Sequence, residues 1–167
     1  MTHLYCIFVL HIFMVCYLAS GNSRRQREDS RIAMASSLRS PALTLTILAG
    51  DFNYVAQDRD RFSRASGHWS TLDDSSEEDS FTTNVADPFG LYQLEQDDFT
   101  HSSALGRSKL DRAYVNQHVC EQLDRHVGCV PLSWVPHLSA HRPVLFYRRR
   151  PAYDGSRGSP LPAAPMR

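Results

Sequence analysis

The chain of 167 residues has no surplus of either charge, because 18 Lys and Arg residues balance 18 Asp and Glu residues. Proteins that bind nucleic acid strongly and without sequence preference usually carry a basic surplus, since phosphate contacts dominate their affinity. The balance argues against strong non-specific binding and leaves room for a local basic patch. We expect two short arginine clusters to be exposed to solvent. They comprise Arg24, Arg25, Arg27 and Arg31, and Arg148, Arg149 and Arg150.

Cysteine is also scarce, and its spacing excludes two common uses. The four cysteines form no Cys-x-x-Cys pair, so the sequence predicts neither a zinc ribbon nor a redox motif. Cys120 and Cys129 could form a disulfide bond in an oxidising compartment, or both could remain reduced and partly buried. The sequence leaves these alternatives open.

The longest apolar stretch, residues 4–18, is too short and too interrupted to predict a membrane span. Together with the small residues 19–21 it has the outline of a secretory signal peptide, although no Lys or Arg precedes it. Alternatively, residues 7–12 form a buried β-strand. We favour the strand, and we expect an intracellular chain rather than a secreted one.

Apolar periodicity predicts an α/β order along the chain. Residues 30–38 have a rough apolar stripe that is typical of a short helix ending before Pro41. Residues 43–49 and 110–115 are predicted strands, and residues 144–147 form a closing strand. A strand, a helix and a further strand in succession are typical of a layered α/β unit.

Two segments have the composition of flexible chain. Residues 57–80 are polar and contain five acidic residues between positions 73 and 79, without the glycine spacing of a calcium-binding loop. We expect a solvated, mobile acidic loop there. Residues 148–167 are rich in Pro, Gly and Arg, and we expect a disordered tail.

The most informative stretch is Gly50-Asp51-Phe52-Asn53, directly after the apolar strand. Side chains two residues apart on a strand point to the same side, so Asp51 and Asn53 are expected to lie together. A carboxylate and a carboxamide in that position can hold a phosphate, a water molecule and a hard metal ion.

Two later motifs add to this one. Asp111 lies within an apolar strand, where an unpaired charge is costly, so it needs a partner. His141 in the third motif, Ser139-Ala140-His141, is one candidate, because a carboxylate can fix an imidazole tautomer. The alternative is a structural ion pair with Lys109 or Arg112.

In order and spacing, these three motifs resemble the C-terminal half of the endonuclease/exonuclease/phosphatase superfamily, which includes the DNase-I-like nucleases and retrotransposon-type endonuclease domains. The resemblance covers roughly residues 5–147. It implies an α/β fold, a partial four-layer sandwich of two packed mixed sheets flanked by helices, truncated at the N-terminus. Residues 1–22 would then be an apolar strand or signal segment, residues 23–147 the half-domain, and residues 148–167 the tail.

The resemblance also implies roles for individual residues. Relatives hydrolyse phosphodiesters of nucleic acid or other phosphate esters with Mg²⁺ or Mn²⁺. In the family, the aspartate of the second motif hydrogen-bonds the histidine of the third, so the resemblance makes His141 the partner of Asp111. His11 is a further catalytic candidate, because it lies 40 residues before Asp51, at a spacing where the family has a histidine near the end of a core strand. The main catalytic candidates are Asp51, Asn53, Asp111 and His141, and the candidates for binding phosphate or substrate are Thr100 and Ser139.

The chain departs from the family pattern in two ways. Ala140 stands where the family has an acidic residue near the metal, and the Asn and Glu of the family's N-terminal half have no counterpart. Loss of such ligands costs tenfold or more in affinity or activity, so we expect weak or lost hydrolysis. The alternative is a small secreted or membrane-associated protein without enzymatic activity, whose motifs are vestigial. No stable protein partner is expected.

Overall fold

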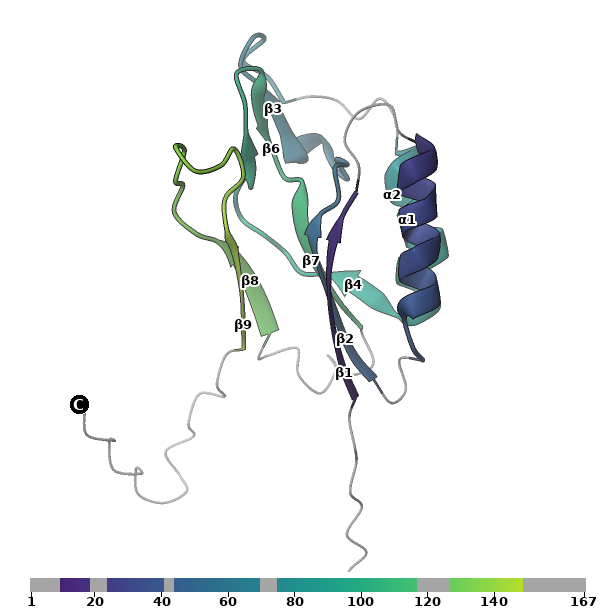
Figure 1. Ribbon diagram of the computed structural model, residues 1–167. Helices are drawn as coiled ribbons and strands as arrows, with labels where there is room; N and C mark the ends of the chain where they lie inside the picture. Colours follow the sequence, from purple (N-terminus) through teal and green to yellow (C-terminus); the bar gives the residue numbers. More distant parts are fainter. Residues whose placement is uncertain (1–9, 19–23, 41–43, 70–74, 117–126, 149–167) are drawn as a thin grey trace, which may run out of the picture.

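The computed structural model describes residues 10–18, 24–40, 44–69, 75–116 and 127–148 (Figure 1). These residues form a mixed α/β fold with two α-helices, a four-stranded mixed sheet and two small antiparallel sheets, which confirms that the fold is of the α/β type. The helices are α1 (Arg24–Ser37) and α2 (Ser76–Phe81), and α2 continues into the helical turns η2 (Thr82–Ala86) and η3 (Asp87–Phe89). The strands are β1 (Leu10–Tyr17), β2 (Thr44–Asp51), β3 (Arg61–Ser63), β4 (Leu91–Gln93), β5 (His101–Ser102), β6 (Gly106–Ser108), β7 (Asp111–Asn116), β8 (Val127–Pro131) and β9 (Val144–Arg148).

The four-stranded sheet has the order β1-β2-β7-β4. β1 runs parallel to β2, whereas β7 is antiparallel to both of its neighbours. β1 and β2 approach closely at Gly50, whose φ is +149° and where a Cβ atom would lie 1.9 Å from the carbonyl oxygen of Cys16. Only glycine therefore fits directly before Asp51.

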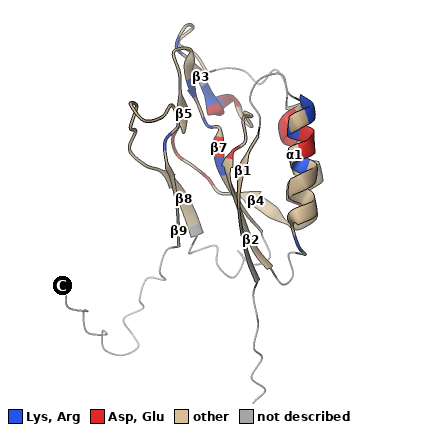
Figure 2. Ribbon diagram, viewed as in Figure 1, with Lys and Arg blue, Asp and Glu red and all other residues tan. Residues whose placement is uncertain are grey.

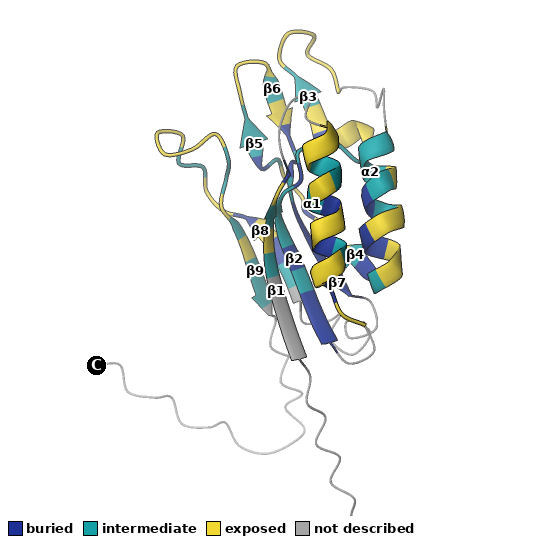
Figure 3. Cartoon of the chain, turned by 45° about the vertical axis from the view of Figure 1, so that its right-hand side comes forward, coloured by how far each residue is buried: buried dark blue, intermediate teal, exposed yellow. Residues whose placement is uncertain are grey.

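Side chains of the central strands alternate between two hydrophobic cores, as the two-residue period of a strand requires. Leu48 and Tyr114 belong to the core beneath α1 and α2. Ala113 and Val115 point the other way and pack with Cys129 of the β8–β9 hairpin. The helices thus cover one face of the sheet and the hairpin covers the other, with the exposed residues of the helices on their outer side (Figures 1 and 3).

Helix α1 is longer than the sequence predicts, because it begins at Arg24 rather than Ser30. Its first turns carry charged residues of both signs (Figure 2). Arg31 is only 2% exposed and forms ion pairs with Glu28 at 2.7 Å and with Glu77 of α2 at 2.6 Å. The expectation of a solvent-exposed arginine cluster is therefore wrong for Arg31, because carboxylates compensate its buried charge.

The expected mobile acidic loop, residues 57–80, contains ordered elements. It includes the 3₁₀ turn η1 (Asp58–Asp60) and β3, which pairs with β6, and Phe62 forms a further bridge to Trp69. Glu77 in the first turn of α2 also pairs with Arg27 at 2.9 Å. The expectation is wrong for these parts, since ladder hydrogen bonds and ion pairs hold them in place, while residues 70–74 lie outside the described ranges.

The first strand is present but shifted along the chain. β1 continues beyond His11 to Tyr17, and His11 lies opposite Leu45, whereas Tyr17 lies opposite Asp51. At about 3.3 Å per residue, the six strand positions between Leu45 and Asp51 span about 20 Å. The sequence-based interpretation of His11 as a catalytic candidate beside Asp51 is therefore wrong.

Several expectations fall on residues outside the described ranges. These are the possible signal segment apart from β1, Cys120, and the tail from residue 149 onwards. Arg148 is the last residue of β9, and Cys129 is buried with a free thiol. Within the described ranges, no helix is long and apolar enough to span a membrane.

Candidate functional site

The sequence-predicted site residues meet where β2 ends and β7 begins. The antiparallel register places Asp51 directly opposite Asp111, so two carboxylates face each other at this edge of the sheet. His141, on the loop before β9, lies between them. The structure therefore brings together the acidic residues of the first two motifs and the histidine of the third.

The turn after β2 fixes the Asp51 side chain. Asn53 adopts a left-handed conformation with φ of 51°, which asparagine tolerates better than most residues. Its backbone N–H donates a hydrogen bond to Oδ1 of Asp51 at 2.9 Å. Its side-chain amide donates to the carbonyl oxygen of Leu18, which ties the turn to the end of β1. Both the backbone N–H and the side-chain amide of Asn53 therefore stabilise the turn.

Phe52 anchors the same turn from below. Its side chain is fully buried, and its ring makes edge-on contacts with Tyr54, Phe81 and Tyr114 at centroid distances of 5.9, 5.1 and 5.1 Å. Burying a phenylalanine side chain contributes about 1.5–3 kcal/mol. Phe52 therefore anchors the turn that carries Asp51 to the core beneath α1 and α2.

The expected contact between Asp111 and His141 is present. Oδ2 of Asp111 lies 2.9 Å from Nδ1 of His141, and Nε2 of the same ring lies 3.7 Å from Oδ2 of Asp51. The side chain of His141 remains 35% exposed, whereas those of Asp51 and Asp111 are 12% and 17% exposed. The imidazole therefore presents the solvent-facing part of the cluster.

Lys109 and Arg112, the alternative partners of Asp111, are engaged elsewhere. Arg112 is buried and pairs with Asp60 at 2.7 Å, and Nζ of Lys109 lies 3.8 Å from the same carboxylate. Among the described residues, no ion pair joins either cation to Asp111. The carboxylate of Asp111 is therefore left to orient His141.

Thr100 supports the site from beneath. Its side chain is fully buried, and its hydroxyl oxygen accepts hydrogen bonds from the backbone N–H groups of Leu110 at 3.1 Å and Asp111 at 3.0 Å. Its carbonyl oxygen accepts a further bond from the N–H of Arg142 at 2.7 Å. In place of the expected contact with substrate, Thr100 holds the start of β7 and the histidine loop in register.

The histidine loop is closed by Ser139 and Ala140. The hydroxyl of Ser139 accepts a hydrogen bond from the N–H of His141 at 2.9 Å. The carbonyl oxygen of Ala140 accepts one from the N–H of Ser102 at 3.0 Å. Both residues are exposed, so the hydroxyl of Ser139 remains within reach of a ligand while it shapes the loop.

His101 belongs to the site, although we did not single it out from the sequence. Its ring centroid lies 4.8 Å from that of His141, and the two residues form a backbone bridge. Its Nδ1 lies 3.2 Å from the hydroxyl of Ser108. Its position directly after Thr100 could have indicated it, because successive side chains of a strand point to opposite faces, so the residue after a buried one faces outwards.

Burial and neighbouring charges shift the pKa values of two groups in the site. Burial raises the pKa of Asp51, and repulsion from Asp111 adds to this, while the Asn53 hydrogen bond and His141 oppose it. Burial lowers the pKa of His101, and the neighbouring His141 lowers it further. The site therefore combines a carboxylate that takes up a proton more readily with an imidazole that releases one more readily.

The described residues do not form a divalent metal site of their own. No group of three or more His, Cys, Asp and Glu side chains in the described ranges is arranged to hold a metal ion. Ala140 supplies no side-chain ligand, and one oxygen of Asp111 is already engaged by His141. The Mg²⁺ or Mn²⁺ implied by the family resemblance therefore does not fit this part of the chain.

No protein-family model matches this chain, and no curated protein matches its sequence. The case for a function therefore rests on the residues and their geometry.

Proposed function

We propose that Asp51, Asp111 and His141 form part of the active site of a phosphodiester hydrolase of the endonuclease/exonuclease/phosphatase type. The observation that carries the proposal is the position of the His141 ring, 2.9 Å from Asp111 and 3.7 Å from Asp51 at an exposed edge. In this proposal the described fold corresponds to the C-terminal half of the family's four-layer α/β sandwich.

Each of the three side chains has a chemical role in the proposal. Asp111 accepts a hydrogen bond from Nδ1–H of His141 and so directs Nε2 of the ring towards Asp51 and the substrate. When Nε2 carries a proton, it donates a hydrogen bond to a phosphate oxygen and compensates developing negative charge. Asp51, whose raised pKa brings it closer to that of an effective base, accepts a proton from the attacking water.

The expected activity is weak. The described residues provide one imidazole beside the phosphate and no set of metal ligands, so little positive charge is available to stabilise the transition state. No step is assigned to Mg²⁺ or Mn²⁺. The substrate class is a phosphodiester, in nucleic acid or in another phosphate ester.

The test is hydrolysis of bis(p-nitrophenyl) phosphate and of supercoiled plasmid by the purified chain, with EDTA and with added Mg²⁺ or Mn²⁺. We expect slow hydrolysis that falls in Asp51→Asn and in His141→Gln and rises in Ala140→Asp with added metal. Asp29→Asn, an exposed carboxylate on α1, is the matched control. Equal rates in Asp51→Asn, His141→Gln and Asp29→Asn would contradict the proposal.

The second candidate is a secreted protein without enzymatic activity, favoured by the apolar stretch of residues 4–18 followed by small residues. N-terminal sequencing of the expressed protein separates the two. A mature start near residue 20 supports secretion, and an intact Met1 argues against it.

A further inference from the structure

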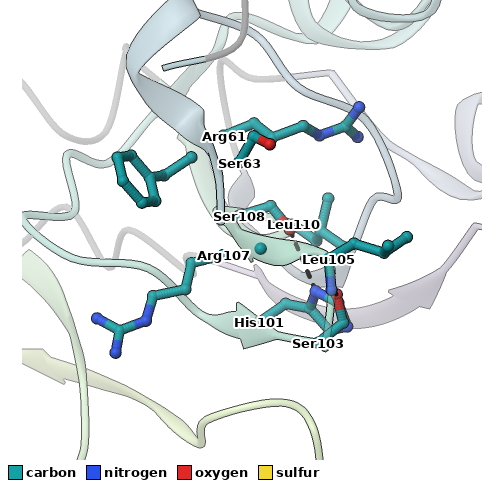
Figure 4. A pocket seen from close by; sticks show the side chains of 10 residues that line it. Arg61, Ser63, His101, Ser103, Leu105, Arg107, Ser108 and Leu110 are labelled. Carbon is teal, nitrogen blue, oxygen red and sulfur yellow. Dashed lines mark hydrogen bonds between the residues drawn. The ribbon is translucent and has the colours of Figure 1, made fainter. Parts of the chain in front are cut away.

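A hollow of about 440 Å³ lies beside His101 on the small sheet formed by β3, β6 and β5 (Figure 4). One row of side chains crosses this sheet, with Arg61 opposite Ser108 and Ser108 opposite His101. Residues directly opposite each other in an antiparallel sheet share one face. Arg61, Ser108 and His101 therefore line the same side of the hollow.

A glycine in the lining fixes the close approach of β6 to β3. Gly106 lies opposite Ser63. A Cβ atom at Gly106 would lie 2.1 Å from the backbone carbonyl oxygen of Phe62, so no larger residue fits without a backbone shift. Ser63 and Ser103 add hydroxyl groups to the lining.

The charged side chains that line the hollow, Arg61 and Arg107, are both positive. Arg61 is exposed, and no ion pair joins it to any residue in the described ranges. Its charge contributes to lowering the pKa of His101, after the larger effects of burial and of His141 in the same direction and of Asp51 and Asp111 in the opposite direction. An anion beside Arg61 would receive hydrogen bonds from a guanidinium and hydroxyl groups.

The hollow lies next to the proposed active site. His101 lines the hollow, and its ring centroid is 4.8 Å from that of His141. A ligand held by its phosphate at His141 therefore reaches the hollow by passing one imidazole ring. Because the formal net charge is zero, we do not expect a general basic surface to bind a polynucleotide, and binding would depend on a local site.

We infer that the hollow binds a second phosphate group of the substrate, next to the phosphate held at His141. The inference rests on the proposed function and specifies its substrate class as a polynucleotide strand rather than a phosphate monoester or a small diester. Arg61 holds the second phosphate, and His101 with Ser108 forms the wall between the two phosphate positions.

The test is fluorescence anisotropy of a fluorescein-labelled single-stranded oligothymidylate, measured over a series of salt concentrations, beside hydrolysis of bis(p-nitrophenyl) phosphate. In Arg61→Gln we expect oligothymidylate binding to weaken roughly tenfold at low salt. The slope of log affinity against log salt should fall by about 0.7, the value for one phosphate of a single strand. Hydrolysis of the small diester should not change.

Two further variants provide controls. Arg25→Gln removes an exposed arginine from α1 and should bind the oligothymidylate like the wild type. Arg61→Lys keeps the charge and should keep the salt slope while losing part of the affinity, because lysine cannot make a bidentate contact. Far-UV circular dichroism of each variant excludes unfolding as the cause of weaker binding.

The outcomes separate this inference from the proposed function. Equal oligothymidylate binding by Arg61→Gln and Arg25→Gln would overturn the second phosphate position, whatever the hydrolysis rates. If Arg61→Gln lost small-diester hydrolysis by the same factor as oligothymidylate binding, the inference would also be overturned, because the small diester has no second phosphate. Weaker binding in Arg61→Gln together with unchanged hydrolysis in His141→Gln would support the hollow as a phosphate site and contradict the proposed function.

Discussion

Two clusters of charged side chains in this chain are built in opposite ways. The Arg31 cluster joins α1 to α2 and pairs two guanidinium groups with two carboxylates, Glu28 and Glu77, at distances of 2.6–2.9 Å. The cluster of Asp51, Asp111 and His141 sets two carboxylates around one imidazole. The first cluster is balanced in charge, and the second has a surplus of negative charge.

The pKa shifts of the carboxyl groups record this difference. Burial by itself would raise the pKa of Glu77, but hydrogen bonds from Arg27 and Arg31 outweigh it and lower that pKa. In Asp51 burial and Asp111 raise the pKa. A lowered carboxyl pKa stabilises the folded state at neutral pH, whereas a raised one costs stability there. The Arg31 cluster therefore contributes to the stability of the fold, whereas the second cluster costs stability, and we assign it a chemical role only in the proposed function.

We expect the largest effect from a variant that breaks only the cluster of Asp51, Asp111 and His141. In Asp111→Asn the His141 tautomer is no longer fixed by a carboxylate, so phosphodiester hydrolysis should fall roughly 100-fold, about 2.7 kcal/mol in activation free energy. The midpoint of urea unfolding should change little. Initial rates and urea titrations of the same preparation measure both quantities. Asp29→Asn is the control, and an unchanged rate in Asp111→Asn would remove Asp111 from the mechanism.

We expect the next largest effect from a variant that breaks only the Arg31 cluster. Arg31→Met retains the apolar part of the side chain and leaves Glu77 with one cationic partner, so the free energy of unfolding should fall by about 2 kcal/mol. Hydrolysis per folded molecule should be unchanged, because the cluster lies on the helix face of the sheet. Urea unfolding followed by circular dichroism measures the loss. If Arg31→Met were no less stable than the exposed control Arg25→Met, the cluster would not stabilise the fold.

We expect a smaller effect from a variant that removes the hydrogen bonds of Thr100 to the start of β7, which carries Asp111. Thr100→Val removes the hydroxyl that accepts two backbone hydrogen bonds, and it should destabilise the protein by about 1–2 kcal/mol. Hydrolysis should also fall, because the start of β7 carries Asp111. Thr83→Val, at an exposed position in η2, is the control for both measurements. A loss of stability with a fully retained rate would show that Asp111 keeps its position without Thr100.

The smallest effect distinguishes the clusters by their pH dependence. The raised pKa of Asp51 costs stability above that pKa, and the cost disappears as pH falls below about 4, the unfolded value. Asp51→Asn should therefore be more stable than wild type at pH 7, by about 0.5 kcal/mol, and show no gain at pH 3.

Glu77→Gln should show the opposite sign. Its lowered pKa contributes stability that is present above the ordinary carboxyl pKa and is lost as pH falls through the folded value. The variant should be less stable than wild type at pH 7 and closer to it at low pH. Urea unfolding at several pH values measures both variants. Parallel pH profiles for Asp51→Asn and Glu77→Gln would contradict the distinction between the clusters.

The sequence was sufficient for elements with strong apolar periodicity. The strands predicted at residues 43–49, 110–115 and 144–147 match β2, β7 and β9 to within two residues at each end. The start of α1 could not be predicted, because its first half is polar and its arginines are stabilised by Glu77, which lies 46 residues after Arg31. Periodicity describes contact with an apolar core and carries no information about such ion pairs.

The candidate site was predictable to a similar extent. The rule that a carboxylate in an apolar strand needs a partner, together with the family resemblance, predicted the contact between Asp111 and His141, and the structure contains it. The hollow beside His101 was not predictable, because it requires β3, β5 and β6 to pair in one register. The prediction for His11 was wrong because the apolar run continues past it, so the sequence does not show where the strand ends.

Local sequence by itself determined how the chain turns after β2, because glycine readily adopts the φ of 149° at position 50 and asparagine tolerates the left-handed conformation at position 53. The tertiary structure alone decided which charges are compensated. Arg112 finds Asp60 across 52 residues and Arg31 finds Glu77 across 46, whereas Asp51 and Asp111 are brought together by strand register. Coulomb energy depends on distance in space and on burial, and neither quantity follows from position along the chain.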